Sequence, residues 1–253
     1  MNRERLSRGL MAMGIPADGQ AMDRFEAFHA LLDEANARMD LTAVLDEDER
    51  VDRHDLDSAA PLAQGLIPAG AAVIDVGTGA GFPGMPLLIL RPDLRMTFLD
   101  AQQKRIAFLA HALEALGLTA VTLHARAEDA ARMAQHREKY DCAVSRAVAA
   151  APVLQELTLP FVAVGGTAIA WKGPGVRQEW DAARRASFLL GGALRAPLPA
   201  PVPGRHEWEH LLLVTDKQRP TPKAYPRRAG TPAKRPLGTA QAEREDSHAV
   251  QKG

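Results

Sequence analysis

The stretch DVGTGAGFPG, residues 75 to 84, contains four glycines and follows directly on the apolar run AAVI. Glycine adopts positive φ without strain and lets a ligand come close to the backbone. A strand that ends in such a loop and leads into a helix is typical of a site for a nucleotide-like cofactor. Gly77 and Gly79 are therefore candidates for cofactor contact, and the side chains around them must indicate which cofactor.

Residues 79–84 formally match the dinucleotide pattern G-x-G-x-x-G, and Asp100 follows 21 residues after the first of these glycines. Two features argue against a dinucleotide. Pro83 and Pro86 crowd the helix start, where a pyrophosphate needs backbone N–H groups. Asp75 would place a negative charge beside a phosphate, but it suits the ammonium and sulfonium groups of S-adenosylmethionine. The loop favours a methyl-donor site.

Charged residues also stand at the ends of three further apolar runs. Asp100 ends TFLD, and its carboxylate can accept hydrogen bonds from both ribose hydroxyls, although a helix N-cap explains it equally well. Ala127 and Glu128 follow VTLHAR, where an acid or a backbone group can bind the adenine edge, again with a helix cap as the alternative. Arg146 ends DCAVSR, and burying its charge without an anionic partner would be costly, which favours a role in binding.

Short β-rich runs alternate with helical segments between residues 71 and 217. This alternation predicts an α/β fold of parallel strands joined by right-handed crossovers, with helices on both faces of the sheet. In such sheets, ligands bind at the carboxyl ends of the strands, where the strand order switches. The expected strands are AAVIDVG, MTFLDA, AVTLHA, DCAVSRA, GTAIAWKG and EWEHLLLV.

The chain divides into three parts by pattern. Residues 1–66 are expected to form a helical N-terminal extension, with Asp18 as the N-cap of an amphipathic helix. Residues 67–217 are expected to form the α/β domain. Residues 218–253 are a basic, proline-rich tail that is expected to end in a disordered segment.

Length and composition narrow the class of protein. The chain has 253 residues, and Lys plus Arg (31) equal Asp plus Glu (31), so net charge alone indicates no partner. The single cysteine, Cys142, excludes an intrachain disulfide and supplies no metal cluster. No apolar stretch approaches the length of a membrane span, and the first residues do not resemble a signal peptide. We expect a cytoplasmic protein that binds neither membrane nor metal.

Two missing motifs narrow the chemistry of a methyl transfer. Enzymes that methylate exocyclic amino groups of bases resemble one another in an Asn/Asp-Pro-Pro-aromatic motif after the fourth strand, where this chain has SRAV. Enzymes that methylate ring carbon 5 need a cysteine nucleophile, and no cysteine stands at a strand end. The remaining chemistry is attack by a ring nitrogen with its own lone pair, which needs alignment rather than a general base.

Basic residues that could contact RNA phosphates lie mainly in residues 219–237, which hold six basic residues, five prolines and no acid. We expect an extended, unpacked segment; a solvated linker and a brace of the domain are the alternatives. Lys172, after the fifth strand, is a further candidate. His54 and Asp57 lie at i and i+3 on one helix face. They are interpreted either as substrate-binding residues or as a contact among the N-terminal helices. The tail candidates are Arg227, Arg228, Lys234 and Arg235.

Seven ordered motifs resemble those of the bacterial ribosomal RNA small subunit methyltransferase G family, also called glucose-inhibited division protein B. They are LTAV, RHDLDS, DVGTGAGFPGMPL, FLDAQQKRIAFL, YDCAVSRAV, WKG and YPRRAGTPAKRPL, and the resemblance covers about residues 20–237. Two departures are small. Asp40 stands where the family usually has asparagine, and residues 80–82, Ala-Gly-Phe, replace a common Pro-Gly-Leu.

The resemblance implies a Rossmann-like class I S-adenosylmethionine-dependent methyltransferase with a seven-stranded sheet. It also implies methyl transfer to N7 of one guanine in small-subunit (16S) ribosomal RNA, free or in the 30S particle, and we expect a monomer. Arg146 and Lys172 are the candidates for orienting the guanine. Two other functions stay open, a non-catalytic RNA-binding assembly factor and a NAD-dependent oxidoreductase. The donor contacts carried over by position are Gly77, Phe82, Ala127, Glu128 and Arg146.

Overall fold

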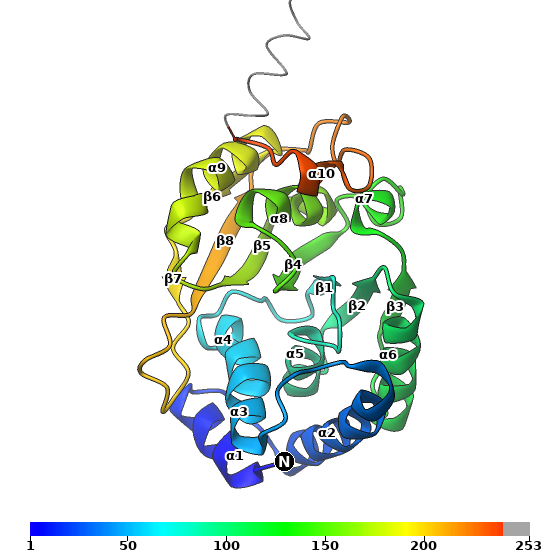
Figure 1. Cartoon of the computed structure of the whole chain (residues 1–253), viewed down its shortest axis with the longest axis vertical. Coiled ribbons are helices and arrows are strands. Elements are labelled where there is room, and N and C mark those ends of the chain that lie inside the picture. Colours follow the sequence, from blue (N-terminus) through cyan, green and yellow to red (C-terminus); the bar gives the residue numbers. More distant parts are fainter. Residues whose placement is uncertain (240–253) are drawn as a thin grey trace, which may run out of the picture.

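The structure, a computed structural model, describes residues 1–239 and is built on an eight-stranded sheet (Figure 1). Residues 240–253, the end of the tail that the sequence predicts to be disordered, lie outside the described residues. The strands are β1 (Ala72–Val76), β2 (Arg95–Asp100), β3 (Val121–His124), β4 (Tyr140–Arg146), β5 (Val162–Lys172), β6 (Gly192–Leu194), β7 (Leu198–Pro199) and β8 (Leu211–Lys217).

The strand order is β3-β2-β1-β4-β5-β8-β6, with β7 paired to β8 beside this path. Strands β1 to β5 are parallel, and β8 runs antiparallel to β5, β6 and β7. All six runs expected to be strands form strands, and the seven-stranded path implied by the resemblance is present. Two strands were not among the six expected runs: β6, which completes the seven-stranded path, and β7, which lies beside it. Both are too short to carry an alternating pattern in the sequence.

Helices cover both faces of the sheet, because successive strand residues point to opposite faces. Val73 of β1 belongs to the same apolar cluster as residues of α5 (Gly84–Leu90) and α6 (Gln103–Ala115). Its neighbour Ile74 belongs to a cluster on the opposite face. That face is covered by α7 (Ala127–Ala130), α8 (Ala151–Thr158), the 3-10 helix η2 (Leu159–Phe161) and α9 (Val176–Leu189). The predicted α/β architecture is confirmed. No helix within residues 1–239 has the length and apolarity to cross a membrane.

The N-terminal extension packs on the face that carries α5 and α6. Asp18 caps α2 as expected, because its carboxylate accepts the N–H of Ala21 at 2.8 Å. Phe25 and Phe28 are fully buried in the same apolar cluster as α5 and α6, so the extension shares one core with the sheet. Its helices are α1 (Arg3–Ala12), α2 (Gly19–Met39), α3 (Glu47–Arg50), the π-helix η1 (Val51–Leu56) and α4 (Asp57–Ala63).

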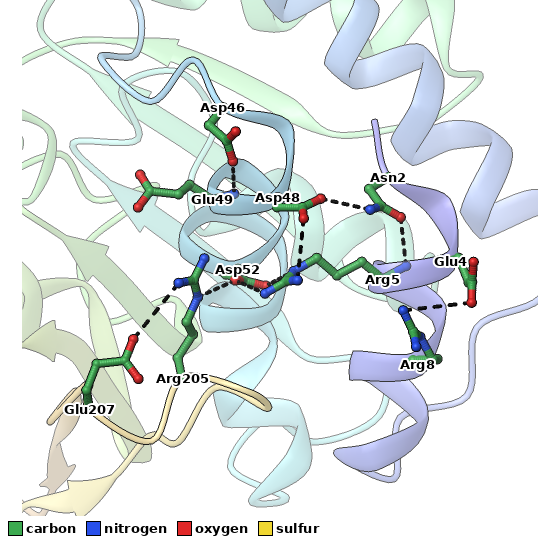
Figure 2. A network of polar contacts seen from close by, with 10 residues as sticks. All are labelled: Asn2, Glu4, Arg5, Arg8, Asp46, Asp48, Glu49, Asp52, Arg205 and Glu207. Atoms are coloured by element: carbon green, nitrogen blue, oxygen red, sulfur yellow. Dashed lines mark hydrogen bonds and ion pairs between the residues drawn. The ribbon is translucent and has the colours of Figure 1, made fainter.

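A buried carboxylate, Asp52 in η1, links α1 to the β7–β8 loop (residues 200–210), as Figure 2 shows. Arg5 donates to it through Nε at 2.7 Å, and Arg205 does so through Nε at 2.6 Å. Burial alone would raise the pKa of Asp52, but the two guanidinium groups outweigh it and hold this pKa below its usual value. The ion pairs therefore fix the β7–β8 loop against the extension.

Residues 219–239 fold back over α8 and α9 and include the short helix α10 (Thr231–Lys234). Nη2 of Arg227 lies 2.6 Å from Oε2 of Glu156, a fully buried residue of α8. The expectation of an extended, unpacked segment is therefore wrong. A buried carboxylate elsewhere in the chain supplies the anionic partner that the segment itself lacks.

Candidate active site

A cavity of about 720 Å³ lies at the carboxyl ends of β1, β2 and β4, where the strand order switches between β1 and β4. The loops after β1 to β4 line it, and the N-terminal extension and the tail add to its rim. Most of the residues predicted from the sequence meet here. They are Gly77, Gly79, Phe82, Asp100, Ala127, Glu128, Arg146, His54 and Asp57.

The loop after β1 requires glycine at positions 77 and 79, where φ is +72° and +58°. A Cβ on Gly77 would lie 2.7 Å from Cγ2 of Val148, in the loop after β4, whereas one on Gly79 would meet no atom within 4 Å. The N–H of Gly77 donates to the carbonyl of Leu99 at 2.8 Å, and that of Gly79 donates to Oδ2 of Asp100 at 3.0 Å. The glycine loop is thus pinned to the end of β2 and open toward the cavity.

Asp75 does not line this cavity, which corrects the prediction that it faces a positively charged ligand. It is fully buried beneath the glycine loop, where Oδ2 accepts the hydroxyl of Thr78 at 2.7 Å and the N–H of Gly84 at 3.0 Å. Burial raises the pKa of Asp75 to about 7, although these hydrogen bonds oppose the rise. Asp75 therefore shapes the loop from below, because the chain turns back over the strand end.

The raised pKa of Asp75 predicts a pH effect on stability. The pKa of the Asp75 carboxyl is roughly 4 in the unfolded chain and about 7 in the folded protein, so the folded protein binds the carboxyl proton more tightly. The stability that comes from this tighter proton binding is lost as the pH rises from about 4 to about 7. Asp75→Asn cannot ionise. We expect its melting temperature to fall less than that of the wild type between about pH 5 and about pH 8. Thermal melts at both pH values test this, and an equal fall in both proteins would contradict it.

Two carboxylates at the cavity edge hold neighbouring segments. Oδ1 of Asp100 accepts the N–H of Gln102 at 2.8 Å, and Oε1 of Glu128 accepts the N–H of Gly230 in the tail at 2.8 Å. Neither acid is the N-cap of the helix that follows it, since those positions are Gln102 and Arg126 and neither of these caps through its side chain. The helix-cap alternative is therefore excluded for both acids.

Arg146, at the end of β4, is held by the N-terminal extension. Its Nη1 donates to Oδ2 of Asp57 at 3.2 Å and to the carbonyl of Arg53 at 2.7 Å. The guanidinium lies 5.4 Å from the centre of the Phe82 ring, and this ring stacks on His54 with 4.4 Å between centroids. Asp57 is thus the anionic partner for the largely buried side chain of Arg146, and the stacked rings form a flat wall beside it.

His54 is neutral in this setting. Burial, followed by the nearby charge of Arg146, lowers the pKa of His54 to about 3. Its Nδ1 lies 3.5 Å from Nη2 of Arg146, which can only donate, and its Nε2 lies 2.8 Å from Oγ1 of Thr42. Nε2 therefore carries the proton, and His54 adds no second positive charge beside Arg146.

Lys172 borders a second cavity, of about 310 Å³, rather than the first. The residues that border both cavities are Asp57, Arg146, Ala147, Ala149 and His210. Nζ of Lys172 lies 3.0 Å from Oε2 of Glu179 in α9, so an ion pair orients the lysine.

The tail candidates for RNA binding separate into two groups. Arg227 is engaged by the ion pair with α8, whereas the other three side chains are exposed. Gly230 and Ala233 line the rim of the larger cavity, so α10 brings exposed basic residues near its mouth. The exposed candidates are Arg228, Lys234 and Arg235.

Sequence analysis missed His210, which borders both cavities and whose Nδ1 lies 2.9 Å from Oδ1 of Asp57. The run EWEHLLLV places this histidine inside an expected strand, but β8 begins one residue later, at Leu211. Because β8 is antiparallel to β5, its amino end meets the carboxyl end of β5, where Leu211 pairs with Lys172. A polar residue at that end of the last strand was the signal that could have found it.

Comparison with known proteins assigns the chain to a family. The rRNA small subunit methyltransferase G (GidB) family matches residues 21–196. The ribosomal RNA small subunit methyltransferase G of Moorella thermoacetica is 45% identical over 225 residues, which are 88% of this chain and 93% of the relative. The enzyme of the same name from Deinococcus radiodurans is 44% identical over 238 residues, 93% of this chain and 92% of the relative.

A solved structure supports the fold. A mutant of MtNAS in complex with S-adenosylmethionine has a TM-score of 0.52 at 13% identity, and the match covers 78% of this chain and 72% of that one. The predicted Rossmann-like class I fold and the family resemblance are both confirmed, and the comparisons give no support to the oxidoreductase or to the non-catalytic assembly factor. With a matched segment that spans most of the sheet and the cavity, the chain belongs to the rRNA small subunit methyltransferase G family.

Proposed function

We propose that the protein transfers the methyl group of S-adenosylmethionine to N7 of a guanine in small-subunit ribosomal RNA. The observation that carries this proposal is the cavity at the β1–β4 switch, where the glycine loop, Asp100, Glu128 and Arg146 face one another. Its volume of about 720 Å³ lies within the range of roughly 300–1,000 Å³ for small-molecule sites.

The residues of the cavity fit this donor. Gly79, where an added Cβ would meet no atom within 4 Å, leaves room for a group against the backbone, and Asp100 offers carboxylate oxygens to ribose hydroxyls. The donor supplies a methyl group on a positively charged sulfur, and the neutral state of His54 keeps a further positive charge away from it. We place the adenine edge beside Ala127 and Glu128, as the sequence motifs imply.

The acceptor needs alignment rather than activation. N7 of guanine already has a lone pair, so no general base is required and positioning supplies most of the catalysis. Phe82 and His54 provide a flat surface, and Arg146 is held in a fixed orientation by Asp57. Arg146 and Lys172 are hydrogen-bond donors that suit O6 of guanine, the hydrogen-bond acceptor next to N7.

The start of α5 argues against a dinucleotide. The pyrophosphate of NAD would bind free backbone N–H groups at a helix N-terminus. Here the N–H of Gly84 donates to Asp75 and that of Met85 to the carbonyl of Gly81, while Pro86 has none. These three positions therefore offer nothing to a pyrophosphate.

The proposal includes the setting in which the enzyme works. Its substrate is small-subunit ribosomal RNA, alone or assembled with proteins, and it acts in the cytoplasm as a monomer. A chain with one cysteine suits a reducing compartment. Cys142 is buried in β4, and burial raises the pKa of its thiol to about 12, which suits a structural role.

Asp100→Asn is expected to weaken S-adenosylmethionine binding by about tenfold or more, because the amide keeps the shape of the side chain but weakens the charge-assisted hydrogen bonds to the ribose. Isothermal titration calorimetry measures this decrease. Asp129→Asn, at an exposed acid near the same rim, should bind like the wild type. Unchanged affinity in Asp100→Asn would mean that Asp100 only braces the glycine loop through Gly79.

Exposed basic residues of the tail are expected to bind RNA phosphates. Replacing Arg228 and Lys234 by glutamine should weaken binding of small-subunit ribosomal RNA and flatten its dependence on log salt by about 0.7–0.9 for each phosphate that is no longer neutralised. RNA affinity at several salt concentrations measures the slope. An unchanged slope would contradict RNA binding by these residues, and S-adenosylmethionine affinity should stay at the wild-type value.

A binding and transfer experiment tests the proposed function. The protein is titrated with S-adenosylmethionine and, separately, with NAD, and is then incubated with small-subunit ribosomal RNA and methyl-labelled donor. We expect binding of S-adenosylmethionine but not NAD, and label in the RNA. Preferential NAD binding would favour an oxidoreductase. Donor binding without any transfer would favour a non-catalytic assembly factor.

A further inference from the structure

The second cavity, of about 310 Å³, adjoins the donor cavity on the side of β5 and β8. Arg146, Ala147 and Ala149 border both cavities and so form the wall between them. Ala147 has φ +57°, a left-handed conformation that is uncommon for a residue with a side chain and that concentrates at functional sites. The volume lies at the small end of the range for ligand sites and suits a single base.

The polar side chains around the second cavity are mostly hydrogen-bond donors. Arg146 and Lys172 can only donate, and Nε1 of Trp171 is engaged by the carbonyl of Asp57 at 2.8 Å. Both carboxylate oxygens of Asp57 already have partners, Oδ1 with His210 and Oδ2 with Arg146. Among the side-chain acceptor atoms that border this cavity in the described part of the chain, Nε2 of His210 is the one without a hydrogen-bond partner.

The ring of His210 has a fixed tautomer and orientation. Nδ1 lies 2.9 Å from Oδ1 of Asp57, and because an ionised carboxylate only accepts, Nδ1 carries a proton; in the tautomer with this single proton, Nε2 keeps its lone pair. Trp208 stacks on the ring with 5.1 Å between centroids, and the guanidinium of Arg53 covers Trp208 at 4.6 Å. The His210 side chain is 30% exposed, and no hydrogen bond to Nε2 is formed within residues 1–239.

We propose that Nε2 of His210 recognises the target guanine by accepting a hydrogen bond from its 2-amino group; this inference rests on the proposed function. N7 belongs to the five-membered ring of guanine, and the 2-amino group stands at the far end of the six-membered ring. A guanine with N7 toward the donor cavity therefore extends its 2-amino group into the second cavity. Adenine has no 2-amino group, so His210 helps the enzyme to distinguish the two purines.

The test compares methyl transfer to small-subunit RNA that carries either guanine or inosine at the target position. Inosine keeps N7 and lacks the 2-amino group. We expect kcat/KM of the wild type to fall by about tenfold on inosine. The kcat/KM of His210→Ala on guanine should be about tenfold below that of the wild type, and its kcat/KM on inosine should be no lower than on guanine. His210→Gln should recover part of the activity, because its amide oxygen can accept in place of Nε2.

Two controls separate recognition from folding. The ratio of guanine to inosine activity within one variant does not depend on the folded fraction, and S-adenosylmethionine affinity should be unchanged in all variants. His206→Ala is the matched variant, since His206 is exposed in the same loop and borders neither cavity, and it should behave like the wild type.

Two outcomes overturn the inference while the proposed function stands. One is wild-type kcat/KM of His210→Ala on guanine. The other is a kcat/KM of His210→Ala that is a further tenfold lower on inosine than on guanine, since the 2-amino group would then be bound by another residue. A wild-type protein that binds the donor and transfers no methyl group would instead refute the proposed function, and this inference with it.

Discussion

Gly77→Val is expected to reduce the affinity for S-adenosylmethionine by about 100-fold or more, which corresponds to roughly 2.7 kcal/mol. The backbone at this position has φ +72°, which a β-branched residue avoids. The new Cβ would also lie 2.7 Å from Cγ2 of Val148, so the two loops that face each other across the cavity would have to move apart. Calorimetric titration of the variant measures the decrease in affinity.

The matched control for this prediction is Gly117→Val. Gly117, after α6, has φ +60° and no atom within 4 Å of an added Cβ, so its substitution brings similar backbone strain away from the cavity. Gly117→Val should lower the melting temperature and leave donor affinity unchanged. A folded Gly77→Val protein that binds the donor like the wild type would refute the placement of the donor against the glycine loop.

Arg227→Ala is expected to destabilise the protein by about 3 kcal/mol, because it leaves a buried carboxylate without its charged partner. Glu156 is fully buried, and it accepts from Nε of Arg227 at 3.0 Å and from Nη2 at 2.6 Å. For a chain of this length, such a change lowers the melting temperature by roughly 6–12 °C. Differential scanning calorimetry measures it.

A second substitution tests the cause. Adding Glu156→Gln to Arg227→Ala removes the unpaired charge and should restore a large part of the stability. Arg228→Ala, at the exposed neighbour, should change the melting temperature little. If Arg227→Ala and Arg228→Ala melted alike, the tail segment would not brace the domain through this ion pair.

The features that could be predicted lie within single stretches of sequence. An apolar run followed by glycines or by a charged residue marks a strand end, and Asp100, Glu128 and Arg146 line the cavity where the strand alternation places them. The glycine pattern indicated a loop that lines the same cavity. These signals are local, and they require no knowledge of the path between the strands.

The features that could not be predicted depend on segments far apart in the chain. Asp57 and His210 are 153 positions apart, and nothing in either stretch indicates the other. Asp75 follows the strand-end pattern, yet the loop after it turns back and buries it. The tail was expected to be unpacked because it has five prolines and no acid, but the partner of Arg227, Glu156, lies on α8, where its sequence position did not distinguish it.

Mass spectrometry can locate the methylated position in small-subunit ribosomal RNA after reaction with the purified protein and S-adenosylmethionine, and it thereby tests the proposed reaction. In the proposed reaction, a ring nitrogen is aligned with the methyl donor without a general base, so we expect one methyl group on N7 of one guanine, absent from a parallel reaction with Gly77→Val. A methyl group on an exocyclic amine, on ring carbon 5 or on a ribose hydroxyl would contradict the account, and so would unmodified RNA.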